Sequence, residues 1–123
     1  MAKIKVKIND ELSIELRQCK EVYGHDDSLP YNAKLFVNDV EVGKVYNDGW
    51  GGDPVIDGPV PQEPLLTKVE NYLHENHSFV YTTRDGQRKC FPLDLGYVLD
   101  AAAYECIDHK KKEIELLEIE GVE

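Results

Sequence analysis

The amino-terminal segment alternates apolar and charged residues, the pattern of a β-strand with one buried face. Residues 3–8 read KIKVKI, and residues 12–16 read LSIEL. A three-residue turn over residues 9–11 keeps the apolar side chains of both strands on one face, although such turns usually contain glycine and this one has none. We therefore expect a hairpin that pairs Ile8 with Leu12, Val6 with Ile14, Ile4 with Leu16 and Lys5 with Glu15.

A second hairpin is predicted within residues 31–46. The segment KLFVNDVEVGKVY turns at Asn38 and Asp39, two residue types that tolerate the positive φ of a tight turn. A two-residue turn at this point pairs Val37 with Val40 and Leu35 with Val42, and it aligns Tyr31 with Tyr46. Phe36 and Glu41 then share the opposite face.

A helix and a third hairpin are predicted next. Residues 64–76, PLLTKVENYLHEN, carry apolar residues at helical spacing and have Pro64 in the first turn. A hairpin that turns at Asp85 and Gly86 would pair Thr82 with Lys89 and Val80 with Phe91.

The carboxyl-terminal part predicts a second helix. Asp94 is a suitable N-cap, and the buried stripe of the helix would consist of Leu95, Val98, Leu99, Ala102 and Cys106. Residues 110–120 fit either an extension of this helix or a strand through Ile114 and Leu116, and we favour the strand.

Together these elements predict a single α+β domain over residues 1–123, in which antiparallel hairpins form a sheet that two helices cover. Residues 47–64 contain four of the nine glycines and four of the six prolines. We therefore expect this segment to be a long loop rather than a helix or a central strand. Long loops inside compact domains are often functional.

The charge balance narrows the class of partner. The chain has 24 acidic and 14 basic residues, a net charge of −10 at pH 7. This charge disfavours general nucleic-acid and anionic-membrane binding, which need basic patches, and favours partners with a basic surface. No apolar run approaches the ~20 residues that span a bilayer, and the amino terminus lacks a signal-peptide block, so we expect a cytoplasmic protein.

The stretch YNDGWGGD, residues 46–53, is the strongest functional hint, because it places the only tryptophan among three glycines. It does not fit a calcium loop, since Val55 and Pro64 occupy positions counted from Asp53 that need oxygen ligands. Asp48 and Asp53 would repel a phosphate.

Trp50 has two interpretations. It either folds back as a lid over the end of the sheet or presents an exposed anchor to a partner. We take Asp48, Trp50 and Asp53 as candidate binding residues. Arg84 and Arg88, two of the three arginines, complete the set as contacts for an anion or a nucleotide, although protection of an edge strand explains them equally well.

Histidines and cysteines give only partial sites. His74 and His77 are half of a zinc site, so we predict no metal and no cofactor. An enzyme could use Cys106 with His109 or Cys90 with His77, but core packing explains both thiols better. An odd number of widely spaced cysteines also fits reduced thiols rather than a disulfide framework.

The sequence KLFVNDVEVGKVYNDGWGG, a hairpin that runs into N-D-G-x-G-G, resembles small uncharacterised proteins of bacteria and their phages. The resemblance covers residues 34–52 and carries no named activity. It implies an accessory or phage-borne protein, a setting that suits small inhibitors of host or defence proteins.

From these observations we predict a non-enzymatic acidic interaction protein that binds and occludes a partner protein with a basic surface. The alternative is a small-molecule or nucleotide binder that uses the glycine-rich loop with Arg84 and Arg88. Neither direct nucleic-acid binding nor a membrane is expected, and the sequence leaves a homo-oligomer open.

Overall fold

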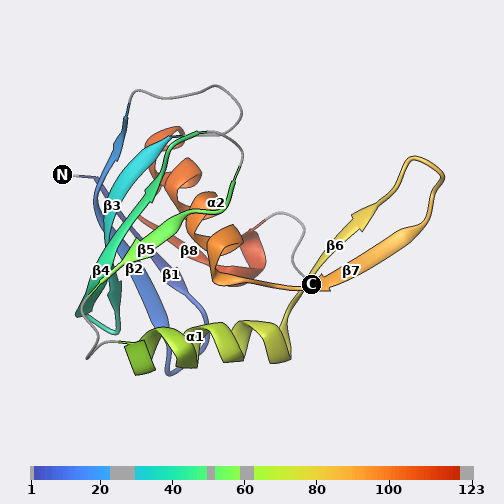
Figure 1. Cartoon of the computed structure of the whole chain (residues 1–123), viewed down its shortest axis with the longest axis horizontal. Helices are drawn as coiled ribbons and strands as arrows, with labels where there is room; N and C mark the ends of the chain where they lie inside the picture. Colours follow the sequence, from blue (N-terminus) through green and yellow to red (C-terminus); the bar gives the residue numbers. More distant parts are fainter. Residues whose placement is uncertain (1, 23–29, 50–51, 59–62, 120–123) are drawn as a thin grey trace.

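The computed structural model describes residues 2–22, 30–49, 52–58 and 63–119. The strands are β1 (Lys3–Lys7), β2 (Ser13–Glu21), β3 (Tyr31–Val37), β4 (Val40–Asn47), β5 (Val55–Asp57), β6 (Ser78–Thr82), β7 (Arg88–Pro92) and β8 (Glu113–Glu115). The helices are α1 (Glu63–Asn76), α2 (Leu95–Ile107) and the short 3-10 helix η2 (Leu116–Glu118) (Figure 1). The predicted α+β class is confirmed.

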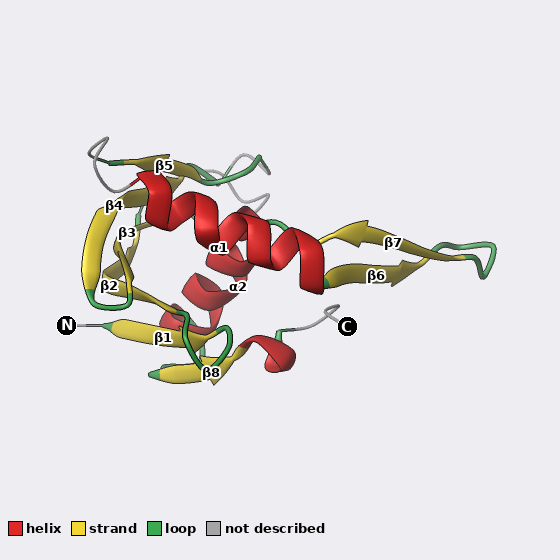
Figure 2. Ribbon diagram, turned by 90° about the horizontal axis from the view of Figure 1, so that it is seen from below, coloured by secondary structure: helices red, strands yellow, loops and turns green. Residues whose placement is uncertain are grey.

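One sheet carries most of the fold. Its strand order is β5–β4–β3–β2–β1–β8, and all neighbours are antiparallel except β8, which runs parallel to β1. Helix α2 packs against β1 and β2, and α1 contacts β4, β7 and α2 (Figure 2). The apolar core fills the space between the sheet and the helices.

The first hairpin has the predicted register throughout β1 and β2. Its turn is closed by Asn9, whose side-chain oxygen accepts the backbone N–H groups of Glu11 and Leu12, both at 2.7 Å. None of residues 9–11 has a positive φ. The hydrogen bonds to the asparagine side chain therefore stabilise this turn without a glycine.

The second hairpin turns at Asn38 and Asp39 as predicted, both with positive φ. A β-bulge then adds Val42 to β4 as an unpaired residue, so that Leu35 pairs with Gly43. The predicted pairing of Leu35 with Val42 is therefore wrong. The shift continues to the end of the hairpin, where Tyr31 faces Asn47 and not Tyr46.

The third hairpin stands apart from the large sheet. Among the described strands, β6 and β7 pair only with each other, and both views show them projecting away from the body (Figures 1 and 2). The register differs by one residue from the prediction, since Thr82 faces Arg88 and Val80 faces Cys90. We call residues 78–92 the arm.

The register differs because the turn of the arm has three residues, 84–86, instead of two. Thr83 closes it by donating its N–H to the carbonyl of Gln87 at 2.8 Å. Gly86 takes the left-handed position with φ of +87°.

Both predicted helices are confirmed. Val69 and Leu73 of α1 are buried, and α2 buries the whole predicted stripe. Asp94 caps α2 by accepting the N–H of Tyr97 at 2.7 Å. The tail forms the favoured strand at Ile114, which lies in β8, while Leu116 begins η2.

The described part of the glycine- and proline-rich segment contains a strand that the sequence did not indicate. The short strand β5 lies within residues 47–64 and pairs with β4 at the edge of the sheet. An edge position suits a segment whose prolines exclude it from the centre of a sheet.

Candidate functional site

A buried polar network fixes the start of the glycine-rich segment. Asn47 is 4% exposed, and its side-chain amide donates to the two carboxylate oxygens of Asp100 at 3.2 and 3.4 Å and to the carbonyl of Gly52 at 3.3 Å. The hydroxyl of Tyr31 donates to the same carboxylate at 2.8 Å. Helix α2 is thereby tied to the ends of β3 and β4, where the segment begins.

Burial raises the pKa of Asp100, although the hydrogen bonds from Tyr31 and Asn47 act in the opposite direction. The nearby carboxylates of Asp53 and Asp94 raise this pKa further. The network therefore holds a carboxylate whose charged form is disfavoured in the folded protein.

The predicted loop residues follow directly from this network. Asp48 and Asp53 are both exposed, and Trp50 lies outside the described residues. Between them Gly49 is buried, with φ of +84°, and donates its N–H to the side-chain oxygen of Asn47 at 2.9 Å. Asn47 thus shapes the chain on which the two aspartates are displayed.

Asp53 lines a hollow of about 290 Å³ between the loop and the two helices. The lining residues are Asp53, Pro54, Ile56, Glu70, His74, Asp94, Leu95 and Gly96. Within the described parts of the chain, no group of three or more histidine, cysteine or acidic side chains is arranged to hold a metal ion. Three carboxylates beside apolar side chains suit a lysine or arginine of a partner. We call this site the acidic hollow.

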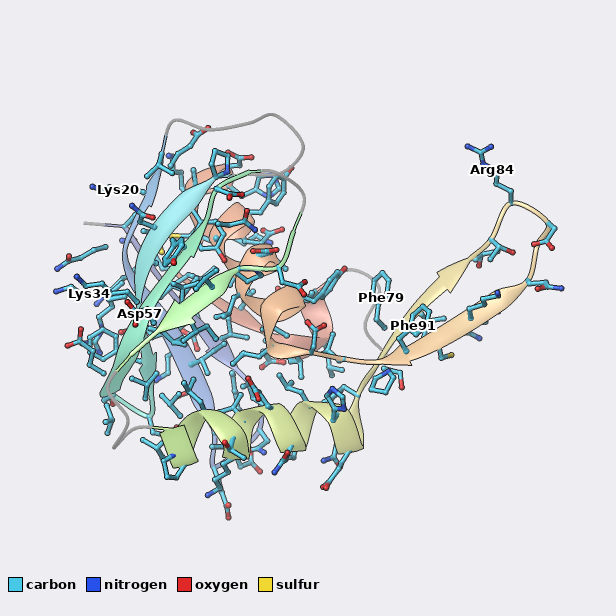
Figure 3. All side chains as sticks on the ribbon, viewed as in Figure 1. Lys20, Lys34, Asp57, Phe79, Arg84 and Phe91 are labelled. Atoms are coloured by element: carbon cyan, nitrogen blue, oxygen red, sulfur yellow. The ribbon has the colours of Figure 1, made fainter. Side chains whose placement is uncertain are left out.

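The root of the arm packs against α2 and is closed by a hydrogen bond between its two flanking residues. Phe79 packs on Tyr97 with ring centroids 4.7 Å apart, and the N–H of Leu93 donates to the carbonyl of His77 at 3.1 Å. Phe91 lies directly opposite Phe79 and is 53% exposed. Figure 3 shows both phenylalanines at the root of the arm.

The two predicted arginines lie on the arm. Arg84 is at the tip (Figure 3), and Arg88 begins β7. Both are exposed, as is Lys89. Asp85 is the one acidic residue of the arm, and a hydrogen bond from the hydroxyl of Thr83 lowers its pKa. The arm is therefore a basic projection from an acidic protein.

The arm also separates the predicted site residues. Arg84 projects away from the body (Figure 3), whereas Asp48 and Asp53 lie between β4 and β5 of the large sheet. The structure does not bring the arginines and the glycine-rich segment together around one pocket.

The thiols lie in two environments. Cys19 and Cys106 are buried, and burial raises the pKa of Cys19, with a smaller contribution from Cys106 beside it. Cys90 is exposed, so the prediction that it packs in the core is wrong. The reason is that β7 lies outside the large sheet.

The histidines predicted as bases have other neighbours. Nδ1 of His109 lies 3.1 Å from Oε2 of Glu105. The ring of His77 contacts that of Tyr72 with centroids 5.8 Å apart, and its buried Nδ1 has no hydrogen-bond partner among the described residues.

Comparison with protein family models, curated proteins and solved structures gave no match. None of the described helices is long and apolar enough to cross a membrane.

The sequence reasoning missed Glu70 and Phe91 as surface features. Nothing local distinguishes Glu70 from the other acidic residues of α1, because its role depends on the approach of Asp53 and Asp94. The sequence predicts Phe91 opposite Val80, one residue away from its observed pairing with Phe79.

Proposed function

We propose that this chain is a non-enzymatic interaction protein that binds another protein through its β6–β7 arm. The observation that carries the proposal is the position of the arm, outside the large sheet and with no neighbouring strand on either edge among the described residues. Unpaired strand edges are templates for a partner chain.

The energetics of the arm support a bound state. A two-stranded hairpin alone in water is at best marginally stable, because it buries too little apolar surface to offset its ordering. All five residues of β7 are exposed, including Phe91 and Cys90. A partner that covers Phe91 would bury the exposed part of an aromatic side chain, which is 53% exposed in this structure.

Charge specifies the chemistry of the partner. The distal half of the arm presents Arg84, Arg88 and Lys89 and suits acidic groups, while the acidic hollow takes a basic side chain. The resemblance to small bacterial and phage proteins supports a more specific role, an inhibitor that occludes a host or defence protein. On this proposal the arm is the occluding element.

The test is recovery of the tagged protein from its own host cells, followed by native mass spectrometry. The variant R84E/R88E should lose its bound protein at physiological salt. The control K68E/K112E makes the same change in net charge at exposed positions outside the arm and should keep it. Circular dichroism verifies that each variant is folded.

Equal recovery of the partner by R84E/R88E and wild type would overturn the proposal. Hydrogen exchange on the purified complex is a second test of whether the arm contacts the partner. Amides of β6 and β7 should exchange more slowly in the complex than in the free protein, and an unchanged rate there would also contradict the role of the arm.

A further inference from the structure

The open face of the large sheet, opposite α2, carries a row of cations. Lys3 faces Arg17, Arg17 faces Lys34, and Lys34 faces Lys44 across four neighbouring strands. Like charges directly opposite one another destabilise a sheet. A row of basic residues is unexpected in a chain that has 24 acidic and only 14 basic residues.

Acidic residues balance only part of this face. In β8, Glu113 and Glu115 lie opposite Lys5 and Lys7. Arg17 is paired with Glu15, contacts Asp39 at 3.2 Å and lies 3.8 Å above the ring of Phe36. Asp57 faces Lys44 from β5, but no ion pair joins Lys44 to any carboxylate among the described residues.

A hollow of about 320 Å³ lies on this face beside Lys34 and Lys44. Its lining residues are Gln18, Lys20, Asn32, Ala33, Lys34, Lys44, Val45 and Tyr46. None of these is acidic, and each of the six polar side chains can donate a hydrogen bond. Lys20 and Lys34 point outward from the face of the sheet (Figure 3).

The local backbone brings the lysines together. Gln18 has φ of +55° at the bulge of β2, and Lys20 resumes pairing opposite Asn32 on the open face. Asn32 in turn faces Tyr46, which is 44% exposed. Lys20, Asn32 and Tyr46 thus form one row across the sheet, next to the row of Lys34 and Lys44.

We propose that this hollow is a binding site for a nucleoside phosphate. Lys34 and Lys44 contact the phosphates with Lys20 beside them, and the ring of Tyr46 stacks on the base. The volume lies at the lower end of the range for small-ligand sites, about 300 to 1,000 Å³. The site lies on the sheet, away from the arm, and is independent of the proposed partner binding.

The test is calorimetric titration with ATP and with inorganic tripolyphosphate. Wild type should bind ATP at one site per chain, and K34E/K44E should bind it at least tenfold more weakly. The control K68E/K112E, with the same net charge, should match wild type. If K34E/K44E fails to fold, K34Q/K44Q removes the two charges without reversing them.

The variant Y46A separates the two sources of phosphate. It should weaken ATP binding severalfold and leave tripolyphosphate binding unchanged. Failure of wild type to bind ATP, equal ATP binding by K34E/K44E, or equal loss in the control would each overturn the site. Saturable binding of a thymidine oligonucleotide without any binding of ATP would also overturn the proposal. The hollow would then be a site for a nucleic-acid strand.

Discussion

Gly43 allows the edge strand β5 to pack closely against β4. Its φ is +152°, and a Cβ built there would lie 2.5 Å from the carbonyl oxygen of Asp57 and 2.8 Å from the Cα of Gly58. Glycine is therefore required twice, for the backbone angle and for the close approach of β5. The bulge beside it is also the reason that the predicted register of the second hairpin fails.

We expect Gly43→Ala to lower the free energy of unfolding by about 1 to 3 kcal/mol, through backbone strain and the clash with β5. Urea unfolding at neutral pH measures the change. Gly52→Ala is the matched control, because nothing lies within 4 Å of its Cβ, and it should change stability by less than ~0.5 kcal/mol. Equal stability of Gly43→Ala and wild type would contradict the packing of β5 on β4.

Among the elements, the arm departs furthest from the sequence prediction. Its alternating apolar residues and its Asp85–Gly86 turn are typical of a hairpin, and a hairpin forms. No local pattern says whether a hairpin joins a larger sheet. Here the short links from α1 at Asn76 to β6 and from β7 to α2 place both strands beyond the edge of the body.

Because the arm buries little, its backbone hydrogen bonds should open independently of the body. In the free protein we expect amides of residues 80–82 and 88–90 to exchange with solvent at least 100-fold faster than those of the central strands β2 and β3. Hydrogen exchange followed by mass spectrometry measures both sets. Equal protection would mean that the arm folds as one unit with the sheet.

At the scale of the whole molecule, the network of Tyr31, Asn47 and Asp100 links the sheet, the glycine-rich segment and α2. Burial raises the pKa of the Asp100 carboxyl group above the ordinary 3.8, so the charged form destabilises the folded protein relative to the protonated form. A group of this kind adds most to stability when it is protonated. Its contribution declines as pH rises from about 3.8 through the folded pKa.

We therefore expect the stability of wild type relative to D100N to fall between pH 4 and pH 7, because the amide does not titrate. The amide retains only one acceptor oxygen for the groups that donate to Asp100, and this loss shifts the whole curve without changing its slope. Urea unfolding across this range measures the difference. D10N, at a side chain that is 99% exposed, controls for removal of one surface charge. A difference that rises with pH would contradict the assignment.

Periodicity and turn chemistry alone predict the α+β class, the register of the first hairpin, both helices and the N-cap at Asp94. Each of these depends on contacts between near neighbours, which periodicity and turn chemistry encode directly. The register of the first hairpin follows from its apolar alternation, because a slip of one residue would expose Ile4 and Val6.

The surfaces proposed for binding depend instead on contacts between segments that are distant in the chain. The parallel pairing of β8 with β1, and the bonds from Asn47 to Asp100, join residues far apart in the chain. The row of Arg17, Lys34 and Lys44 exists only once three strands align. Net charge is a sum over the whole chain and does not show where basic side chains gather. Their alignment depends on strand pairing and on the bulge that shifts the register.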